Sequence, residues 1–480
     1  MELVGAPYFF FLGAVALAHS LLPPRWRMPL LLGASLAFYA MSSVPYLVLY
    51  LLMAAANYGA AMRLGRDDAG PHRLAAFGVV LALDLATLIA FKYLGRPVGS
   101  LLTQLGAAGS WAGAMSSVGG VVKLAAPLGI SYFTFQMVGC VTDAYRRDWK
   151  PTGGLAHFSL FGLFFPQITS GPIPRAPTLL PQLVHQQGGT AADRDAALRL
   201  IAYGLFKKFV VANRLGEYVG QVFPAHGDAA APGYSSLPAL LACIYNVLNL
   251  YADFSSYVDI AIGSARLLGI RLDPNFDRPL ISTSVTEFWR RWHMTLSFWV
   301  RDYVFTPLVF AIGDIGSSGV VLALLVTFAI VGIWHGATWP YLVFGLLQGA
   351  AMSGEMLTKR WRRKRLSGVP PRLIAASGWV YTMSFVVLSQ IFFRAPTLAD
   401  ASTMFSSLGH LDWAGAGEMY AHKGPFDFSL DLVAVALWCG VSRAFRRESA
   451  IPTAAFVLAC ALLVLFVGRL GSGQFIYAAF

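Results

Sequence analysis

The amino-acid sequence predicts an all-α polytopic membrane protein, and its composition and apolar runs carry that prediction. The chain has 480 residues, of which 56% are hydrophobic and only 12% are charged. Soluble domains carry about 25% charged residues. Uncharged apolar stretches about as long as a bilayer core recur from one end to the other. We expect about eleven membrane helices plus re-entrant and interfacial helices, all within one integral-membrane domain over residues 1–480.

The formal net charge is +12, and the positions of the basic residues agree with a membrane topology. Lys and Arg gather in short blocks between apolar segments, such as Lys359–Arg365, which is typical of cytoplasmic loops. We therefore expect the lipid bilayer, and not nucleic acid, as a partner.

The first apolar run precedes Arg25 and Arg27, which indicates a retained first span and not a cleaved signal peptide. The four cysteines are far apart, so neither a disulfide framework nor a zinc ribbon is expected.

The first third of the chain is predicted to consist of membrane-spanning helices joined by short loops. Ser42 and Ser43 separate two apolar runs and predict a tight helical hairpin. Asp84 lies inside an otherwise apolar span. The Gly/Ala/Ser-rich segment Gly99–Gly120 is expected to be an extracytoplasmic excursion or a shallow helix. The predicted spans after the first are Pro29–Met41, Val44–Met62, Leu74–Leu94 and Ala125–Asp143.

The segment His157–Pro181 is apolar but is interrupted by five prolines. Proline removes an amide donor and disrupts helices. Broken backbone at membrane depth is tolerated only where it is buried in protein or lines a wet cavity. We therefore expect a re-entrant element here, the alternative being a proline-rich surface loop. Gln167 lies in this segment.

The next two segments have mixed character. Ala197–Val222 has helical periodicity and contains Lys207 and Lys208, so it is expected to lie along the cytoplasmic interface. Leu237–Ile270 is too long for one span and contains Asp253 and Asp259. We interpret it as a helix pair, or as a span joined to an interfacial helix.

Ser284–Tyr303 is predicted to be an amphipathic interfacial helix. Ser284 and Glu287 fit a capping box, with Ser at the N-cap and Glu three residues later. Seven large apolar residues, three of them Trp, then recur at helical spacing and form one stripe. Arg290 and Arg291 occupy other faces, and His293 lies at the edge of the stripe. Aromatic residues with flanking arginines suit a membrane interface.

Val320–Trp339 is an uncharged apolar run in which His335 is the one ionisable residue. An ionisable side chain at membrane depth costs several kcal/mol unless it faces a cavity or finds a partner. His335 is therefore either a hydrogen-bonded structural residue or a general base, because an imidazole pKa near about 6.5 suits base catalysis at neutral pH. The remaining predicted elements are Pro340–Leu357, Leu373–Phe393, Leu398–Leu408, Ser429–Val441 and Pro452–Val467.

Metal binding is the competing chemical hypothesis. His293, His335, Asp253 and Asp259 offer ligand types that metals use. No HExxH or other close ligand pair is present, so we expect no metal. The sequence also contains no Walker A motif, nucleophile elbow or dinucleotide fingerprint.

Four segments resemble the membrane-bound O-acyltransferase (MBOAT) family, in its bacterial branch that includes alginate O-acetylases and teichoic acid D-alanyl transfer proteins. They are FFPQITSGPIPR (Phe164–Arg175), YADFSSYVDIAIGSARLLGIRL (Tyr251–Leu272), TEFWRRWHMTLSFWVRDYVFTPL (Thr286–Leu308) and GIWHGATWPYLVFGLLQG (Gly332–Gly349). The combination of RRWH with WHG is the most specific of these features. One departure is that Thr306-Pro307-Leu308 leads into Val309-Phe310 and not into a glycine pair, which puts the acceptor or partner in doubt more than the chemistry.

The resemblance implies helices around a central funnel, with peripheral spans over residues 1–120, a catalytic core over about 121–395 and C-terminal spans over 396–480. It implies that His335 is the catalytic histidine and that His293 is a second catalytic position. We expect further substrate contacts from other polar and aromatic residues of these segments, namely Trp334, Trp292, Arg290, Arg291, Asp253 and Gln167.

The implied activity is O-acetylation of an extracytoplasmic polysaccharide of the alginate type, in the inner (cytoplasmic) membrane of a bacterium. The donor is expected to be acetyl-CoA or another acyl thioester, including an acyl carrier, with no bound cofactor. A periplasmic or membrane-anchored partner O-acetyltransferase is expected to complete the transfer. The alternatives are transfer of D-alanyl or another acyl group to a cell-wall polymer, and a non-catalytic transporter or flippase. The carboxylates in or beside apolar runs favour the transporter, whereas the two histidines and the lack of an inverted repeat oppose it.

Overall fold

A computed structural model describes residues 3–66, 72–94, 127–169, 171–186, 188–223, 235–313, 316–409, 417–418, 423–446 and 451–471. Over these residues the chain is helical and contains no strand, as predicted. The predicted excursion Gly99–Gly120 lies outside them. The chain divides into two compact units, which are described separately: Met1–Gly204 with Tyr257–Pro274, and Leu205–Ser256 with Asn275–Phe480.

The first unit is built mainly from the predicted N-terminal spans. The hairpin turn at Ser42–Ser43 is confirmed, because α2 ends at Ala40 and α3 begins at Val44. α2 begins five residues earlier than predicted, at Pro24, since the first helical position tolerates proline. The elements are α1 (Ala6–Leu21), α2 (Pro24–Ala40), α3 (Val44–Leu64), α4 (Arg73–Ile89), the π-helix η1 (Ala90–Leu94), α7 (Ile130–Arg146), α8 (Leu155–Leu163), α9 (Ala176–Val184), most of α10 (Ala191–Phe206) and the end of α12 (Ser236–Leu267).

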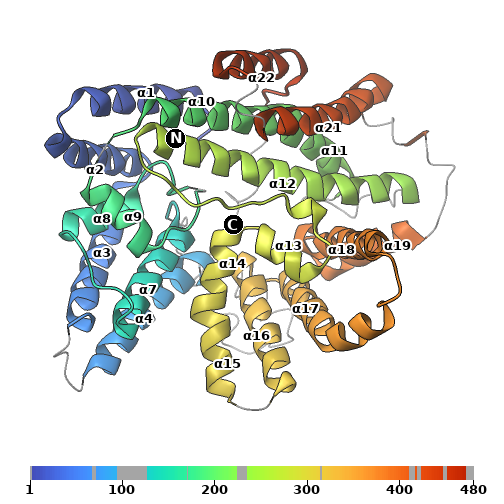
Figure 1. The fold of residues 1–480 in the computed structure, drawn as a ribbon, viewed down its shortest axis with the longest axis horizontal. Helices are drawn as coiled ribbons and strands as arrows, with labels where there is room; N and C mark the ends of the chain where they lie inside the picture. Colours follow the sequence, from blue (N-terminus) through green and yellow to red (C-terminus); the bar gives the residue numbers. More distant parts are fainter. Residues whose placement is uncertain are drawn as a thin grey trace. The chain divides into compact units, whose positions relative to one another are not determined.

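α3, α4 and α7 pack against one another within this unit (Figure 1). Asp84 of α4 is completely buried between them. Its carboxylate accepts a hydrogen bond from Asn57 Nδ2 of α3 at 2.9 Å. Because a buried carboxyl group needs a hydrogen-bond partner, this contact accounts for the acidic residue inside an apolar span.

The proline-rich segment after α8 is non-helical, as predicted. α8 ends at Leu163, and helical structure resumes only at Ala176, the start of α9. Gln167 is buried in this break, and its Nε2 donates to the Phe161 carbonyl oxygen at 2.8 Å. The side chain thereby satisfies a carbonyl that the end of α8 leaves without a helical partner. The re-entrant position of the segment stays a prediction.

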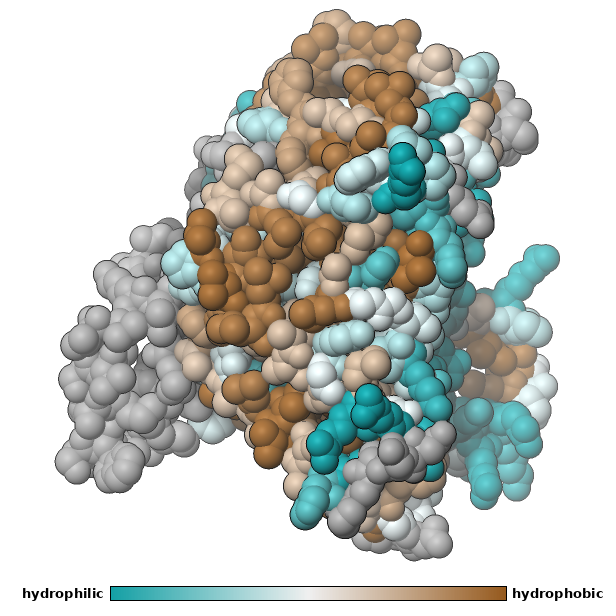
Figure 2. Space-filling view, turned by 90° about the vertical axis from the view of Figure 1, so that its left-hand side faces the viewer, coloured by the Kyte–Doolittle hydropathy of each residue, from teal (hydrophilic) through white to brown (hydrophobic). Residues whose placement is uncertain are grey.

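The first unit also presents an extensive apolar surface. Figure 2 shows hydrophobic residues over much of the face that lies at the left of Figure 1, where α2, α3 and α4 stand. Large side chains on these elements are strongly exposed, including Leu52, Leu74 and Val79 at 65–68%. Apolar patches of this extent mark contact with lipid or protein. The surface therefore agrees with a chain that spans a membrane.

The second unit contains the predicted catalytic histidines. α17 is longer than predicted and continues through the basic run to Arg365. The elements are the π-helix η2 (Lys207–Ala212), α11 (Asn213–Val222), the first part of α12, the 3-10 helix η3 (Pro279–Ile281), α13 (Val285–Arg291), α14 (Met294–Val300), the π-helix η4 (Arg301–Phe305), α15 (Thr306–Ile312), α16 (Ser317–His335), α17 (Trp339–Arg365), α18 (Pro371–Arg394), α19 (Leu398–Gly409), α21 (Gly424–Arg446) and α22 (Thr453–Val467).

The prediction of a helix pair over Leu237–Ile270 is wrong, because α12 is one continuous helix of 32 residues. Gly263 lies inside it without breaking it. A Cβ at Gly263 would lie 2.9 Å from the carbonyl oxygen of Ala197 and 2.8 Å from a side-chain carbon of Ile201. The glycine therefore serves close packing on α10 and does not interrupt the helix.

The lysine pair lies in the protein interior, while the predicted position of its segment along the cytoplasmic interface stays a prediction. Lys207 and Lys208 are 3% and 2% exposed. Lys208 Nζ lies 2.7 Å from Asp253 Oδ1 of α12, and Lys207 Nζ donates to Ser255 Oγ at 2.7 Å. Asp253 compensates a buried positive charge, which explains how a Lys-Lys pair is accommodated in the interior.

α16 and α17 form a tightly packed helical hairpin. A Cβ at Gly345 of α17 would lie 2.1 Å from the Phe328 carbonyl oxygen of α16. A Cβ at Gly332 of α16 would lie 2.3 Å from the Tyr341 carbonyl oxygen of α17. Small residues at such crossings allow two backbones to approach closely, as is common between membrane helices.

Six helical stretches of the described chain are long and apolar enough to cross a membrane: α3, α4 with η1, α12, α16, α18 and α21. The shorter helices α1 and α22 are also apolar. The chain is thus a multi-pass membrane protein, while the predicted number of about eleven membrane helices stays a prediction.

We predict that Gly345→Ala destabilises the protein. The added methyl group has no room against the α16 backbone, and overpacking of this kind costs about 1–3 kcal/mol. The unfolding temperature of the purified protein in detergent measures the effect. Gly354→Ala is the matched control in the same helix, because a Cβ at Gly354 meets no atom within 4 Å. Equal unfolding temperatures for the two variants would contradict the packing argument.

Candidate active site

His335 is the last residue of α16. The helix ends there because Gly336 is extended, and Trp339 begins the next helix after a short turn. The imidazole is 5% exposed and lies among aromatic rings. Its centroid is 4.9 Å from that of Phe393, edge to face, and 4.6 Å from that of Trp334. The ring is thus held in an apolar environment at the end of a helix.

His293 lies at a break that was not predicted. The expected single helix over Ser284–Tyr303 is instead α13 and α14, separated by Trp292 and His293. Trp292 is extended, and His293 has the left-handed conformation with φ 43° and ψ 53°. Bonds from Asn275, in the loop before α13, stabilise this turn. Met294 N donates to the Asn275 carbonyl oxygen at 2.9 Å, and Thr295 N donates to Asn275 Oδ1 at 3.1 Å.

His293 is neutral at physiological pH. The side chain is 1% exposed, and this burial lowers its pKa to about 3. Nδ1 lies 3.1 Å from Asn275 Oδ1. Phe254 packs edge-on against the ring with centroids 4.8 Å apart. These contacts fix the orientation of the imidazole.

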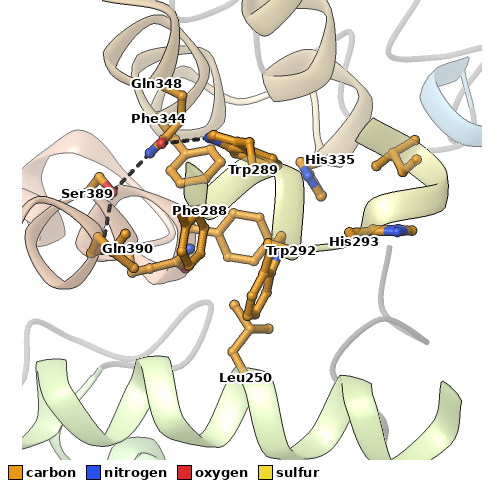
Figure 3. A pocket seen from close by; sticks show the side chains of 13 residues that line it. Leu250, Phe288, Trp289, Trp292, His293, His335, Phe344, Gln348, Ser389 and Gln390 are labelled. Atoms are coloured by element: carbon orange, nitrogen blue, oxygen red, sulfur yellow. Dashed lines mark hydrogen bonds between the residues drawn. The ribbon is translucent and has the colours of Figure 1, made fainter. Parts of the chain in front are cut away.

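Both histidines line one small cavity in the second unit (Figure 3). About 10 Å³ is available to the centre of a water-sized molecule, which is space for about one water. Most of the wall is aromatic or aliphatic, and three polar residues line it besides the two histidines. The lining residues are Leu250, Phe288, Trp289, Trp292, His293, Leu296, His335, Phe344, Gln348, Val386, Ser389, Gln390 and Phe393.

A chain of buried hydrogen bonds joins three helices along one wall of this cavity. Trp289 Nε1 of α13 donates to Gln348 Oε1 of α17 at 3.1 Å. Gln348 Nε2 then donates to Ser389 Oγ of α18 at 3.0 Å (Figure 3). The Trp289 indole N–H and the Gln348 amide thereby have partners in a largely apolar wall, which fixes the indole of Trp289.

Glu355 of α17 holds the start of α13. Its carboxylate accepts from Val285 N at 2.6 Å, and from Thr286 N at 3.0 Å. The predicted capping box is only half confirmed. Ser284 Oγ accepts from Glu287 N, but the Glu287 carboxylate accepts from Thr283 N. A carboxylate from another helix therefore satisfies two of the amides that the first turn of α13 leaves open.

A larger cavity of about 390 Å³ shares Trp289 and Leu296 with the histidine cavity. It lies between α13, α14 and η4 on one side and α16 and α17 on the other, and most of its wall is apolar. Arg290 and Arg301 contribute exposed guanidinium groups. The lining residues are Thr286, Trp289, Arg290, Leu296, Ser297, Phe298, Val300, Arg301, Phe305, Val320, Leu324, Thr327, Phe328, Val331, Met352 and Met356.

The other predicted site residues have different surroundings. Trp292 lines the histidine cavity, and Trp334 packs on His335. Arg291 forms ion pairs with Glu287 and Asp277 at 3.0 and 2.8 Å and lines neither cavity. Asp253 is the buried partner of Lys208, and Gln167 belongs to the first unit.

Sequence reasoning missed Asn275, Gln348 and Glu355. Glu355 offered a signal, because it is an acidic residue inside an apolar run. Asn275 and Gln348 offered none, since polar residues in a loop or a helix have many roles. The part of the chain that the structure describes contains no group of three or more His, Cys, Asp or Glu side chains able to hold a metal ion.

Comparison with known proteins gives a family match and several related chains. The model of the membrane-bound O-acyltransferase family matches residues 150–395. A probable alginate O-acetylase of Azotobacter vinelandii is 31% identical over 84% of this chain and 77% of its own. A peptidoglycan O-acetyltransferase of Helicobacter pylori is 31% identical over 83% and 76%. A teichoic acid D-alanyltransferase of Streptococcus thermophilus is 33% identical over 52% and 60%.

We predict that Glu355→Gln lowers stability by about 1–3 kcal/mol, because an amide side chain has one acceptor oxygen where the carboxylate has two. One of the two α13 amides then loses its partner. Thermal unfolding in detergent measures the change. Glu287→Gln is the control, since Glu287 is half-buried and bonds to Thr283 and Arg291, which lie beside or within its own helix and not on another one. A larger loss of stability in Glu287→Gln would refute the role given to Glu355.

Proposed function

The chain belongs to the membrane-bound O-acyltransferase family, and from that membership we propose that it transfers acetyl groups for O-acetylation of an extracytoplasmic polysaccharide. The chain is thus an O-acyltransferase that uses an acyl donor. We propose that the acyl group is acetyl and that the final acceptor is a polysaccharide. The observation that carries the proposal is one cavity lined by two buried histidines and sized for a very small group. The two acetyltransferases named above are similar to this chain over more than four fifths of its length.

In the proposed reaction His335 is the general base. The imidazole takes the proton of an accepting hydroxyl, whose oxygen attacks the thioester carbonyl carbon. The C–S bond of the resulting tetrahedral intermediate breaks, and the thiolate receives the proton from the imidazolium. The products are an acetate ester and a free thiol. His293, neutral because of its burial, hydrogen-bonds the substrate.

We assign the thioester donor to the larger cavity. Its largely apolar wall suits a pantetheine arm, and Arg290 suits the phosphate groups of acetyl-CoA. Trp289 and Leu296 separate this cavity from the histidines, so a thioester that passes them reaches the reacting groups. Arg291 is tied to two carboxylates, which makes it the weaker candidate for donor binding.

A partner protein is proposed to complete the transfer. The histidine cavity has space for about one water and none for a polysaccharide chain. An accepting hydroxyl must therefore enter on a slender group, such as a side chain of a periplasmic or membrane-anchored O-acetyltransferase. The proposed location is the inner membrane of a bacterium.

The transporter hypothesis has less support. Two of the carboxylates that favoured it have partners: Asp84 bonds to Asn57, and Asp253 to Lys208. Transfer of radiolabelled acetyl from acetyl-CoA to water or to a small hydroxyl-bearing acceptor by the purified protein separates the two classes. Transfer of D-alanyl is the second enzymatic candidate, and its relative matches a shorter part of the chain.

His335→Ala is expected to lower the rate of acetyl transfer by about 10²–10⁴-fold, the usual contribution of a general base. Radiolabelled acetyl-CoA, the purified protein and a small hydroxyl-bearing acceptor provide the assay. His185→Ala, at an exposed histidine of the first unit, is the control and should keep the wild-type rate. A folded His335→Ala protein with wild-type transfer would rule out the catalytic assignment.

Arg290→Ala is expected to raise KM for acetyl-CoA about tenfold or more with little change in kcat, because a charge-assisted bond to phosphate is lost. Arg291→Ala is the matched control, since the adjacent arginine lines neither cavity. Initial rates over a range of acetyl-CoA concentrations distinguish the variants. Equal increases of KM in both would place the donor elsewhere.

A further inference from the structure

Asn275 bonds to three successive residues at the turn between α13 and α14. Its carbonyl oxygen accepts from Met294 N, and its side-chain Oδ1 contacts both His293 and Thr295. Thr295 donates twice to Oδ1, from its backbone N at 3.1 Å and from its Oγ1 at 2.9 Å. The asparagine is 1% exposed, so water does not compete for these bonds.

This arrangement determines which nitrogen of His293 carries the proton. A backbone N–H can only donate, so the Asn275 atom that faces Thr295 N is the oxygen and not the NH₂ group. His293 Nδ1 lies 3.1 Å from the same oxygen and must therefore donate to it. A neutral imidazole has a single N–H, which leaves Nε2 with a free lone pair.

Nε2 of His293 is an unused acceptor. The atom is buried and has no hydrogen-bond partner among the residues that the structure describes. His293 lines the small cavity, and a buried acceptor without a donor costs free energy. A ligand with an O–H group in that cavity would satisfy it.

We infer that Asn275 is a positioning residue: it fixes His293 as the Nδ1–H tautomer, so that Nε2 accepts a hydrogen bond from the hydroxyl of the acceptor. The identity of that hydroxyl rests on the proposed function, whereas the tautomer does not. The assignment excludes His293 as an oxyanion stabiliser, because a nitrogen without a proton cannot donate to an oxyanion. The two histidines thereby have different roles: His335 is the base, and His293 orients the hydroxyl.

The direct test is NMR of the full-length protein labelled with ¹⁵N-histidine in detergent. The His293 signals are identified by their absence in His293→Gln. Wild-type protein should show a protonated Nδ1 and an unprotonated Nε2. Asn275→Ala should lose this signature and populate the Nε2–H tautomer. Asn275→Asp should keep it, because a carboxylate oxygen accepts the same bond.

Thr295→Val is the matched control. It removes one donor to the same Oδ1 but leaves the bond to His293, so the tautomer should not change. In acetyl transfer, Asn275→Ala should lower kcat about tenfold or more, and Asn275→Asp should recover most of that loss. A purely structural role would predict no link between the tautomer and the rate across these variants.

Three results would overturn the inference: an unchanged His293 tautomer in Asn275→Ala, a lost signature in Asn275→Asp, or an equal loss in Thr295→Val. The outcome for the proposed function is separate. If the tautomer follows Asn275 as expected but wild-type protein transfers no acetyl group, the positioning of His293 stands and the proposed function fails. If transfer occurs and the tautomer does not depend on Asn275, the proposed function stands and the positioning role of Asn275 fails.

Discussion

The backbone contact between α16 and α17 is the constraint on which the candidate active site depends. Gly332 and Gly345 leave no space for a Cβ between the two helices, so the two backbones are in close contact at both positions. α16 carries His335 at its end, while α17 carries Gln348 and Glu355. Gln348 fixes Trp289, and Glu355 fixes the start of α13. The crossing therefore links the helix that carries His335 to two residues that position α13, as in a rigid scaffold that preorganises a site.

The sequence was sufficient for the fold class, because the fold class follows from the cost of placing polar groups in an apolar environment. The same cost drew attention to His335, whose catalytic role stays a prediction. The sequence was insufficient for the break at His293. The stripe of Trp and Phe has helical spacing on both sides of the break, and only bonds from Asn275, 18 residues earlier, show that the helix stops. Glu355 accepts a hydrogen bond from the start of α13, which lies 70 residues earlier in the sequence. Asp253 neutralises the charge of Lys208, which lies 45 residues earlier. Periodicity reports local structure, so the break at His293 and the roles of Glu355 and Asp253, which depend on contacts between distant residues, could not be predicted from it.

The two cavities of the second unit suggest a division between holding the donor and performing the chemistry. The larger one is open enough for a long flexible arm, and charged groups lie only at part of its wall. The smaller one has space for about one water. Under the proposed function, a thioester at the histidines meets little competing water, which limits hydrolysis and strengthens electrostatic interactions there. The separation by Trp289 and Leu296 would allow the donor to remain bound while only its acyl end reaches the histidines.

The left-handed backbone at position 293 restricts what that position can become. Histidine, asparagine and aspartate occur in this conformation more often than other non-glycine residues, while β-branched residues are strained there. Most replacements of His293 therefore change two properties together: they remove the imidazole and they disturb the turn that starts α14. Asparagine or glycine at this position would remove the ring but keep the turn. For the same reason, a homologous enzyme that dispensed with an imidazole here would be expected to retain a residue that tolerates a positive φ.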